Sequence, residues 1–159
     1  MPGMFTPLIL RRPDADGFVL LEERVLQLFS EHRQCHQRDP ESGGILLGYR
    51  RGPHLHVAEA TAPLESDEAS RTRFFRSAAP HQKAAIERWR KSGGTMDYLG
   101  EWHTHPEHSP SPSTIDTRGW KRIHSTHKMP MVFVIAGTHD RLWIGLGTRT
   151  DLRSISELV

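Results

Sequence analysis

The order in which helix-like and strand-like segments alternate along the chain restricts its fold more than any other sequence feature. Residues 18–32 carry apolar side chains at helical spacing, namely Phe18, Leu21, Val25, Leu28 and Phe29, which predicts an amphipathic helix. Residues 41–50 instead have a continuous apolar centre, Ile45-Leu46-Leu47, which is typical of a buried strand. A chain that alternates between these two patterns is expected to form an α/β domain.

The remaining segments extend this alternation in both directions. A strand is predicted from residue 54 to residue 57, where polar and apolar side chains alternate, and the turn at 51–53 joins it to strand 41–50 as a hairpin. Further strands are predicted at 8–11, 97–103, 131–136 and 141–147, and helices at 80–91 and 113–127. Residues 62–78 look irregular, apart from a short strand at 74–75. A hairpin among interleaved helices predicts a mixed sheet.

Composition narrows the class of protein. The 159 residues are enough for one domain, and Cys35 is the only cysteine, so no internal disulfide forms and a reducing, cytoplasmic location is expected. Lys and Arg number 21 against 19 Asp and Glu, which indicates a mixed surface and no nucleic-acid partner. No apolar run approaches the roughly 18–20 residues that span a bilayer, and the N-terminus lacks the pattern of a signal peptide, so no membrane association is expected.

The eleven histidines direct attention to the stretch between His103 and Asp116. Because side chains alternate along a strand, His103 and His105 point to the same face, where their imidazoles can share one metal ion. Asp116 lies near the start of the helix predicted at 113–127, and the preceding loop can return it to the end of the strand. Two imidazoles and one carboxylate would leave one position of a Zn²⁺ ion open, as in catalytic sites.

Simpler interpretations exist for each of these residues. A His-x-His pair is more often two polar residues on a wetted strand face than a metal site. Ser113 and Asp116 also have the spacing of a capping box, in which both residues only stabilise the start of a helix.

A second His-x-His pair, formed by His54 and His56, has Asp67 at the same spacing that separates Asp116 from His105. Spacing therefore does not decide between the two sets. In the hairpin strand at 54–57, however, Leu55 and Val57 are the natural inward-facing residues, which leaves both histidines on a solvated face. We therefore favour the set that includes His103.

Taken together, these residues resemble the motif of the JAMM (JAB or MPN+) metallopeptidases. That motif consists of a glutamate on an early strand, then His-x-His-Pro, then Ser-x-x-Asp. It is matched here by Glu41, by His103-Thr104-His105-Pro106 and by Ser113 with Asp116. The resemblance covers about residues 18–147 of a domain expected to span 1–159. More narrowly, the amino-acid sequence around His103 is similar to that of small bacterial JAB proteins encoded in mobile and anti-phage operons.

The resemblance implies a fold related to the cytidine deaminases, with a curved mixed sheet flanked by helices. It implies one Zn²⁺ per chain, bound by His103, His105 and Asp116. Glu41 would be the general base, and Ser113 would stabilise the tetrahedral intermediate. The implied reaction is cleavage after the C-terminus of a ubiquitin-like protein, in its conjugates or its precursor. Activating- and conjugating-enzyme-like proteins of the same operon, which act in antiviral defence, are the implied partners.

The motif residues also bear on two alternative functions. A deaminase or nuclease-like hydrolase on the related fold is disfavoured because the cysteine-containing zinc signature of deaminases is absent. A non-catalytic zinc-binding MPN scaffold would be expected to lack Glu41 or Ser113, and both are present.

Overall fold

The computed structural model describes residues 6–36, 38–62, 68–69, 74–75 and 78–156. Eight strands form one sheet in the order β1-β2-β4-β3-β7-β8-β9-β10, with β2-β4 and β7-β8 parallel and the other neighbours antiparallel. Their bounds are Leu8–Arg11, Phe18–Leu21, His54–Ala60, Gly43–Arg51, Asp97–Thr104, Met131–Ala136, Leu142–Gly147 and Leu152–Ser154, given in sheet order. The predicted mixed sheet is confirmed.

Two short strands form a separate pair. Strand β5 (Glu68–Ala69) is antiparallel to β6 (Phe74–Phe75). The short strand predicted at 74–75 is thus confirmed.

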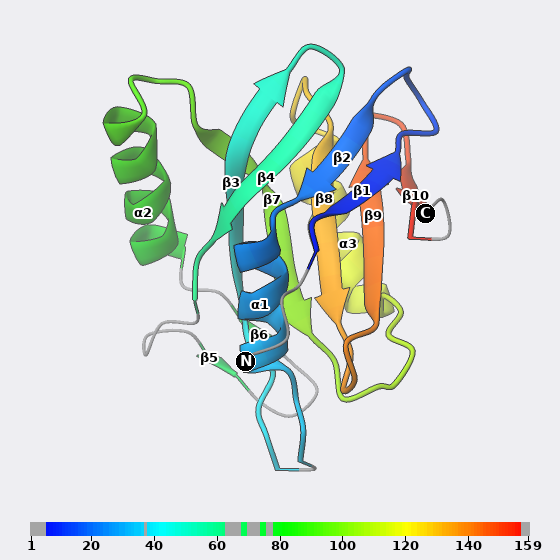
Figure 1. The fold of residues 1–159 in the computed structure, drawn as a ribbon. Helices are drawn as coiled ribbons and strands as arrows, with labels where there is room; N and C mark the ends of the chain where they lie inside the picture. The colour runs from blue at the N-terminus through cyan, green and yellow to red at the C-terminus, as the bar shows by residue number, and fades with distance from the viewer. Residues whose placement is uncertain (1–5, 37, 63–67, 70–73, 76–77, 157–159) are drawn as a thin grey trace.

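The helices lie on both faces of the sheet. Helix α1 (Glu23–His32) is in front of it in Figure 1, α3 (Thr114–His124) is behind it, and α2 (Ala78–Lys91) lies to one side, next to β3. The sheet curves, so that β1 and β2 cross in front of β8 and β9 (Figure 1). None of the helices in the described part of the chain is long and apolar enough to cross a membrane.

Strand β8 shows how the two faces acquire separate cores. Its six residues are all buried, and their side chains alternate between the faces. One set packs under α1 together with Val25 and Trp102, and consists of Val132, Val134 and Ala136. The other set packs under α3 together with Trp120, and consists of Met131, Phe133 and Ile135. Both faces of the central strands are therefore covered, which is why these strands are apolar throughout.

The predicted helix at 18–32 is wrong over its first turn. Residues 18–21 form strand β2, and α1 begins only at Glu23. Strand β2 pairs with β1 on one side and with β4 on the other, which buries Val19 and Leu21 completely. The spacing of Phe18 and Leu21 fits a helix only by coincidence, and pairing with the neighbouring strands decides the structure of this segment.

The other boundaries differ less from the prediction. The hairpin of β3 and β4 is confirmed, but β4 continues to Ala60 after a register shift between Leu47 and Gly48. Helix α3 ends at His124, and Ser125 caps it, so the predicted end at residue 127 was too late. Strand β10 was not predicted, because its three residues carry no alternating apolar pattern.

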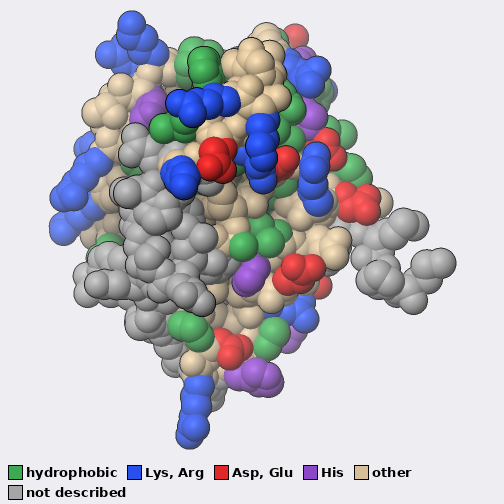
Figure 2. Space-filling view, turned by 90° about the vertical axis from the view of Figure 1, so that its left-hand side faces the viewer, with side chains coloured by type: hydrophobic (Ala, Val, Ile, Leu, Met, Phe, Trp, Pro, Cys, Tyr) green, Lys and Arg blue, Asp and Glu red, His purple; other side chains and the backbone are tan. Residues whose placement is uncertain are grey.

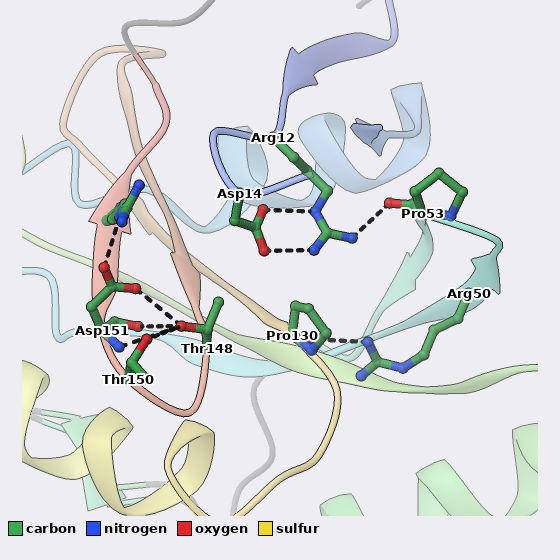
Figure 3. A network of polar contacts seen from close by, with 9 residues as sticks. Arg12, Asp14, Arg50, Pro53, Pro130, Thr148, Thr150 and Asp151 are labelled. Atoms are coloured by element: carbon green, nitrogen blue, oxygen red, sulfur yellow. Dashed lines mark hydrogen bonds and ion pairs between the residues drawn. The ribbon is translucent and has the colours of Figure 1, made fainter. Parts of the chain in front are cut away.

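Arginine contacts join the turns at the end of the sheet remote from Gly43, the first residue of β3 (Figure 3). The Arg12 guanidinium donates to Asp14 at 3.0 and 2.7 Å and to the Pro53 carbonyl at 2.6 Å. These bonds hold the pKa of Asp14 below its ordinary value. Arg50 donates to the Pro130 carbonyl at 2.5 Å.

On the face of the molecule shown in Figure 2, Lys and Arg side chains lie among Asp and Glu side chains, so the charge of this face is mixed.

Candidate metal centre

The end of β7 positions His103 and His105. His103 pairs with Gly43 of β3 and Ile135 of β8, and the His105 N–H donates to the Ala136 carbonyl at 2.9 Å, which extends the pairing by one residue. Both residues are 7% exposed, and their Nε2 atoms lie 3.1 Å apart. The expectation that they share one face of the strand therefore holds in the structure.

A glycine in β7 contributes to this placement. Gly100 has φ +156°, and a Cβ there would lie 1.6 Å from the Val132 carbonyl oxygen, so only glycine fits. The register between β7 and β3 shifts at this point. After the shift Trp102 packs under α1, against Phe29, and the residue that follows it, His103, faces α3.

Helix α3 brings Asp116 to the two histidines. Its Oδ1 lies 3.2 Å from His103 Nε2, and its Oδ2 lies 3.0 Å from His105 Nε2. Trp120, one turn later on the same helix face, stacks on Phe133 at 4.8 Å between ring centroids and also contacts the His103 ring at 5.3 Å. Trp120 therefore anchors α3 to the sheet in the orientation that turns Asp116 toward the imidazoles.

The capping box is also present, so the two interpretations of Asp116 are compatible. The Ser113 N–H donates to Asp116 Oδ2 at 2.8 Å, and the Asp116 N–H donates to Ser113 Oγ at 3.1 Å. Asp116 is thus held in place by the helix start while it faces His103 and His105. Ser113 is exposed, and its Oγ accepts this bond, so its own hydrogen is available to another group.

Glu41 completes the cluster from the loop before β3. It is 2% exposed, and one of its carboxylate oxygens lies with nitrogens of His103 and His105 in a group no wider than 4.8 Å. Within the described residues its Oε2 is buried without a hydrogen-bond partner. Burial raises the pKa of Glu41 to about 8; the charge of His105 lowers it and that of Asp116 raises it further. A buried oxygen without a partner beside two imidazoles fits a site that binds a cation or a water molecule.

The other titratable groups of the cluster shift one another's pKa values. Burial acts to raise the pKa of Asp116, but hydrogen bonds from His103 and His105 outweigh it and hold the value below the ordinary one. Burial acts to lower the pKa of His105, but Asp116 and Glu107 outweigh it and raise the value. Two imidazole nitrogens and an ionised carboxylate form the donor set that zinc prefers in proteins.

Two further residues support the site, and neither was identified from the sequence. Glu107 Oε1 lies 2.7 Å from His105 Nδ1, which directs the opposite nitrogen of that ring toward Asp116. The Thr104 hydroxyl, which is fully buried, accepts from the Ser42 N–H and donates to Gln34 Oε1, both at 2.9 Å. In the sequence, the only indication that the Thr104 side chain is buried is its position between the two histidines, which places it on the opposite face of the strand.

The second His-x-His pair lies elsewhere on the sheet. His54 Nδ1 accepts from the Phe18 N–H at 3.1 Å, and His56 Nε2 lies 2.6 Å from Glu22 Oε1. Asp67 lies outside the described residues. Both histidines thus contact the region around β2 and the start of α1.

The curved mixed sheet, with a carboxylate on a helix opposite paired histidines, has the architecture expected of a JAB-type hydrolase. A family model described as prokaryotic homologs of the JAB domain matches residues 22–145. The chain belongs to this family and is a hydrolase of the peptidase class.

Curated relatives agree with this assignment. The chain is 37% identical over 145 residues to a protein of Escherichia coli named CD-NTase/cGAS isopeptidase, covering 91% of each chain. It is 38% identical over 134 residues to a protein of the same name from Vibrio cholerae, covering 84% of this chain and 85% of that one. A probable metalloprotease of Sinorhizobium fredii is 33% identical over 126 residues, 72% of this chain and 76% of that one.

The fold also has a solved counterpart. The solution structure of a protein from Desulfitobacterium hafniense matches with a TM-score of 0.55, covering 80% of this chain and 82% of that one. At 24% sequence identity, this likeness supports the fold alone.

Proposed function

We propose that this protein is a zinc-dependent isopeptidase that cleaves the bond between the C-terminus of one protein and a lysine of another. The observation that carries the proposal is the convergence of His103, His105 and Asp116 beside the buried carboxyl group of Glu41. The names of three relatives suggest conjugates that contain a CD-NTase, and the JAMM-like motif suggests a ubiquitin-like protein. Activating- and conjugating-enzyme-like proteins would then produce the substrate.

The proposed zinc ligands are His103, His105 and Asp116. Zinc held there would lower the pKa of a bound water, polarise the substrate carbonyl and favour the ionised form of Glu41. Glu107 and the capping box fix the orientations of His105 and Asp116 before any metal binds. The ligands are therefore preorganised by groups of the chain itself.

Glu41 is the proposed general base. Its buried Oε2 has no hydrogen-bond partner among the described residues, which leaves that oxygen able to take a proton from the attacking water. The same carboxyl group can then pass the proton to the departing lysine amine. Burial is what makes this exchange feasible near neutral pH, because it brings the pKa of the carboxyl group closer to the working pH.

Ser113 is the proposed stabiliser of the oxyanion. Its Oγ is oriented by the Asp116 N–H, and its side chain is exposed at the start of α3, where a substrate can reach it. A hydroxyl placed in this way donates to the carbonyl oxygen as negative charge develops there. Such a donor typically contributes about 3–4 kcal/mol to catalysis.

The test uses purified protein and defined isopeptide conjugates, one with a CD-NTase and one with a ubiquitin-like protein on the acyl side. Glu41→Gln should keep one zinc per chain and lose cleavage by at least about 100-fold. His54→Ala is the matched control and should cleave at the wild-type rate.

Three outcomes contradict parts of this proposal. Cleavage by Glu41→Gln at the wild-type rate would remove Glu41 from its role. A wild-type protein that binds zinc but cleaves neither conjugate would support the scaffold interpretation instead. Full activity after zinc removal would exclude the metal mechanism.

A further inference from the structure

A groove runs from the candidate metal centre along α3. It has a volume of about 460 Å³ and opens beside His103 and Asp116, with β7 and the start of β3 forming its other wall. Beyond Asp116 and the buried Trp120, the wall contributed by α3 consists of Ile115, Arg118, Gly119, Arg122 and Ile123. Residues three or four apart lie on the same face of a helix, so these side chains form one stripe that leads away from Asp116.

Gly119 lies in the middle of this stripe, although glycine is among the poorest helix formers. Its backbone is helical, and apart from its chain neighbours and the backbone of its own helix, a Cβ there would meet no atom of the described residues within 4 Å. Neither an unusual backbone conformation nor close packing in the described part of the chain therefore requires glycine. What its missing side chain does is keep the floor of the groove open between Ile115 and Arg122.

The charged groups of the stripe have no partners within the described part of the chain. The guanidinium groups of Arg118 and Arg122 make no hydrogen bond or ion pair with the described residues, whereas Arg12 and Arg88 each bind a carboxylate. Ile115, nearest to the metal centre, is 58% exposed. Along α3 the stripe thus offers an apolar contact at Ile115, then the open floor at Gly119 with Arg118 beside it, and then Arg122; neither cation has a partner among the described residues.

We propose that this groove binds the extended C-terminal tail of the acyl-side protein and selects tails with acidic residues. The inference rests on the proposed isopeptidase function. In an isopeptide bond the amine comes from a lysine side chain, so only the acyl side supplies a chain terminus that can lie along a helix. Gly119 lies under the tail backbone, and Arg118 and Arg122 pair with carboxylates, which guanidinium groups bind in a bidentate manner.

The dimensions set the position of the acidic residues. Ile115 and Arg122 are seven positions apart in the helix, which is roughly 10 Å at 1.5 Å per residue. An extended chain covers that distance in about three residues. Arg118 lies roughly 4.5 Å beyond Ile115 on the same scale, so the acidic side chains are expected at about the second and fourth residues before the cleaved bond, which point to the same face of an extended chain.

Binding is measured by fluorescence anisotropy on the zinc-loaded Glu41→Gln protein, which does not turn the ligand over. The two probes are labelled tail peptides that differ only in having Glu or Gln at the second and fourth residues from their C-terminus. Arg118→Glu and Arg122→Glu should each weaken the Glu peptide at least tenfold and the Gln peptide less than twofold. Lys121→Glu, an exposed neighbour outside the groove, is the matched control and should change neither affinity by more than twofold.

Gly119→Ala separates a binding role from a structural one. It should raise the midpoint of thermal unfolding, because alanine favours the helix, and weaken both peptides about tenfold by filling the floor. The proposal is overturned if neither peptide binds, if Glu and Gln peptides bind equally, if Lys121→Glu has the same effect as Arg118→Glu, or if Gly119→Ala lowers stability. Tail binding without cleavage by the wild-type protein would contradict the proposed function but not this groove.

Discussion

Thr104→Val offers a test of how the proposed base is held in place. Valine has nearly the same shape as threonine, so the substitution removes a hydroxyl without leaving a cavity. The Thr104 hydroxyl lies on the face of β7 opposite the histidines, where it joins Ser42 to Gln34. Gln34 in turn donates to the Asp39 carbonyl at 3.1 Å, so the network spans the loop that carries Glu41.

The magnitude follows from two buried bonds of 2.9 Å. Without the hydroxyl, the Ser42 N–H loses its acceptor next to a new methyl group. A buried donor left unsatisfied costs about 1–3 kcal/mol, and the lost bond to Gln34 adds to this, so we expect the free energy of unfolding to fall by roughly 2–3 kcal/mol. Ser42 directly follows Glu41, so the carboxyl group also loses its fixed position.

The assay combines urea denaturation, zinc analysis and isopeptide cleavage. Thr104→Val should retain zinc, because its proposed ligands are untouched, while kcat falls roughly tenfold or more, since small misplacements of a catalytic group are costly. The matched control is Thr126→Val, whose hydroxyl also bonds to two groups, the Arg122 and Ile123 carbonyls, but is exposed, so water replaces it. A Thr104→Val protein with wild-type stability and wild-type kcat would refute this role.

Two further predictions concern the metal centre. Asp116→Ala should reduce zinc content far below one per chain while His54→Ala keeps it unchanged, as measured by atomic absorption; a fully loaded Asp116→Ala protein would mean that the carboxylate only caps the helix. In the zinc-free protein, folded Glu41 keeps its proton up to a pKa of about 8, whereas the unfolded chain releases it near the ordinary value of 4.5. The free energy of unfolding should therefore fall as pH rises between these values, and Glu41→Gln should remove roughly 3 kcal/mol of this decline between pH 5 and pH 8, as measured by denaturation at both pH values. Parallel pH profiles of the two proteins would contradict the raised pKa.

The helix predicted at 18–32 shows where local patterns mislead. Phe18 and Leu21 fit a helical spacing, yet residues 18–21 gain more by pairing with β1 and β4 than by extending α1. Such pairing depends on β4, which lies more than thirty residues away along the chain. No window of local sequence contains that information.

The amino-acid sequence by itself determined the local geometry of this protein. Strand alternation placed His103 and His105 on one face, and the spacing of Ser113 and Asp116 specified a capping box, because both depend only on residues a few positions apart. Only the tertiary structure decided that Asp116 faces the imidazoles, because that depends on Trp120 packing α3 against β8. The polar network around Thr104 and the groove along α3 likewise arise from segments that meet only in the folded chain.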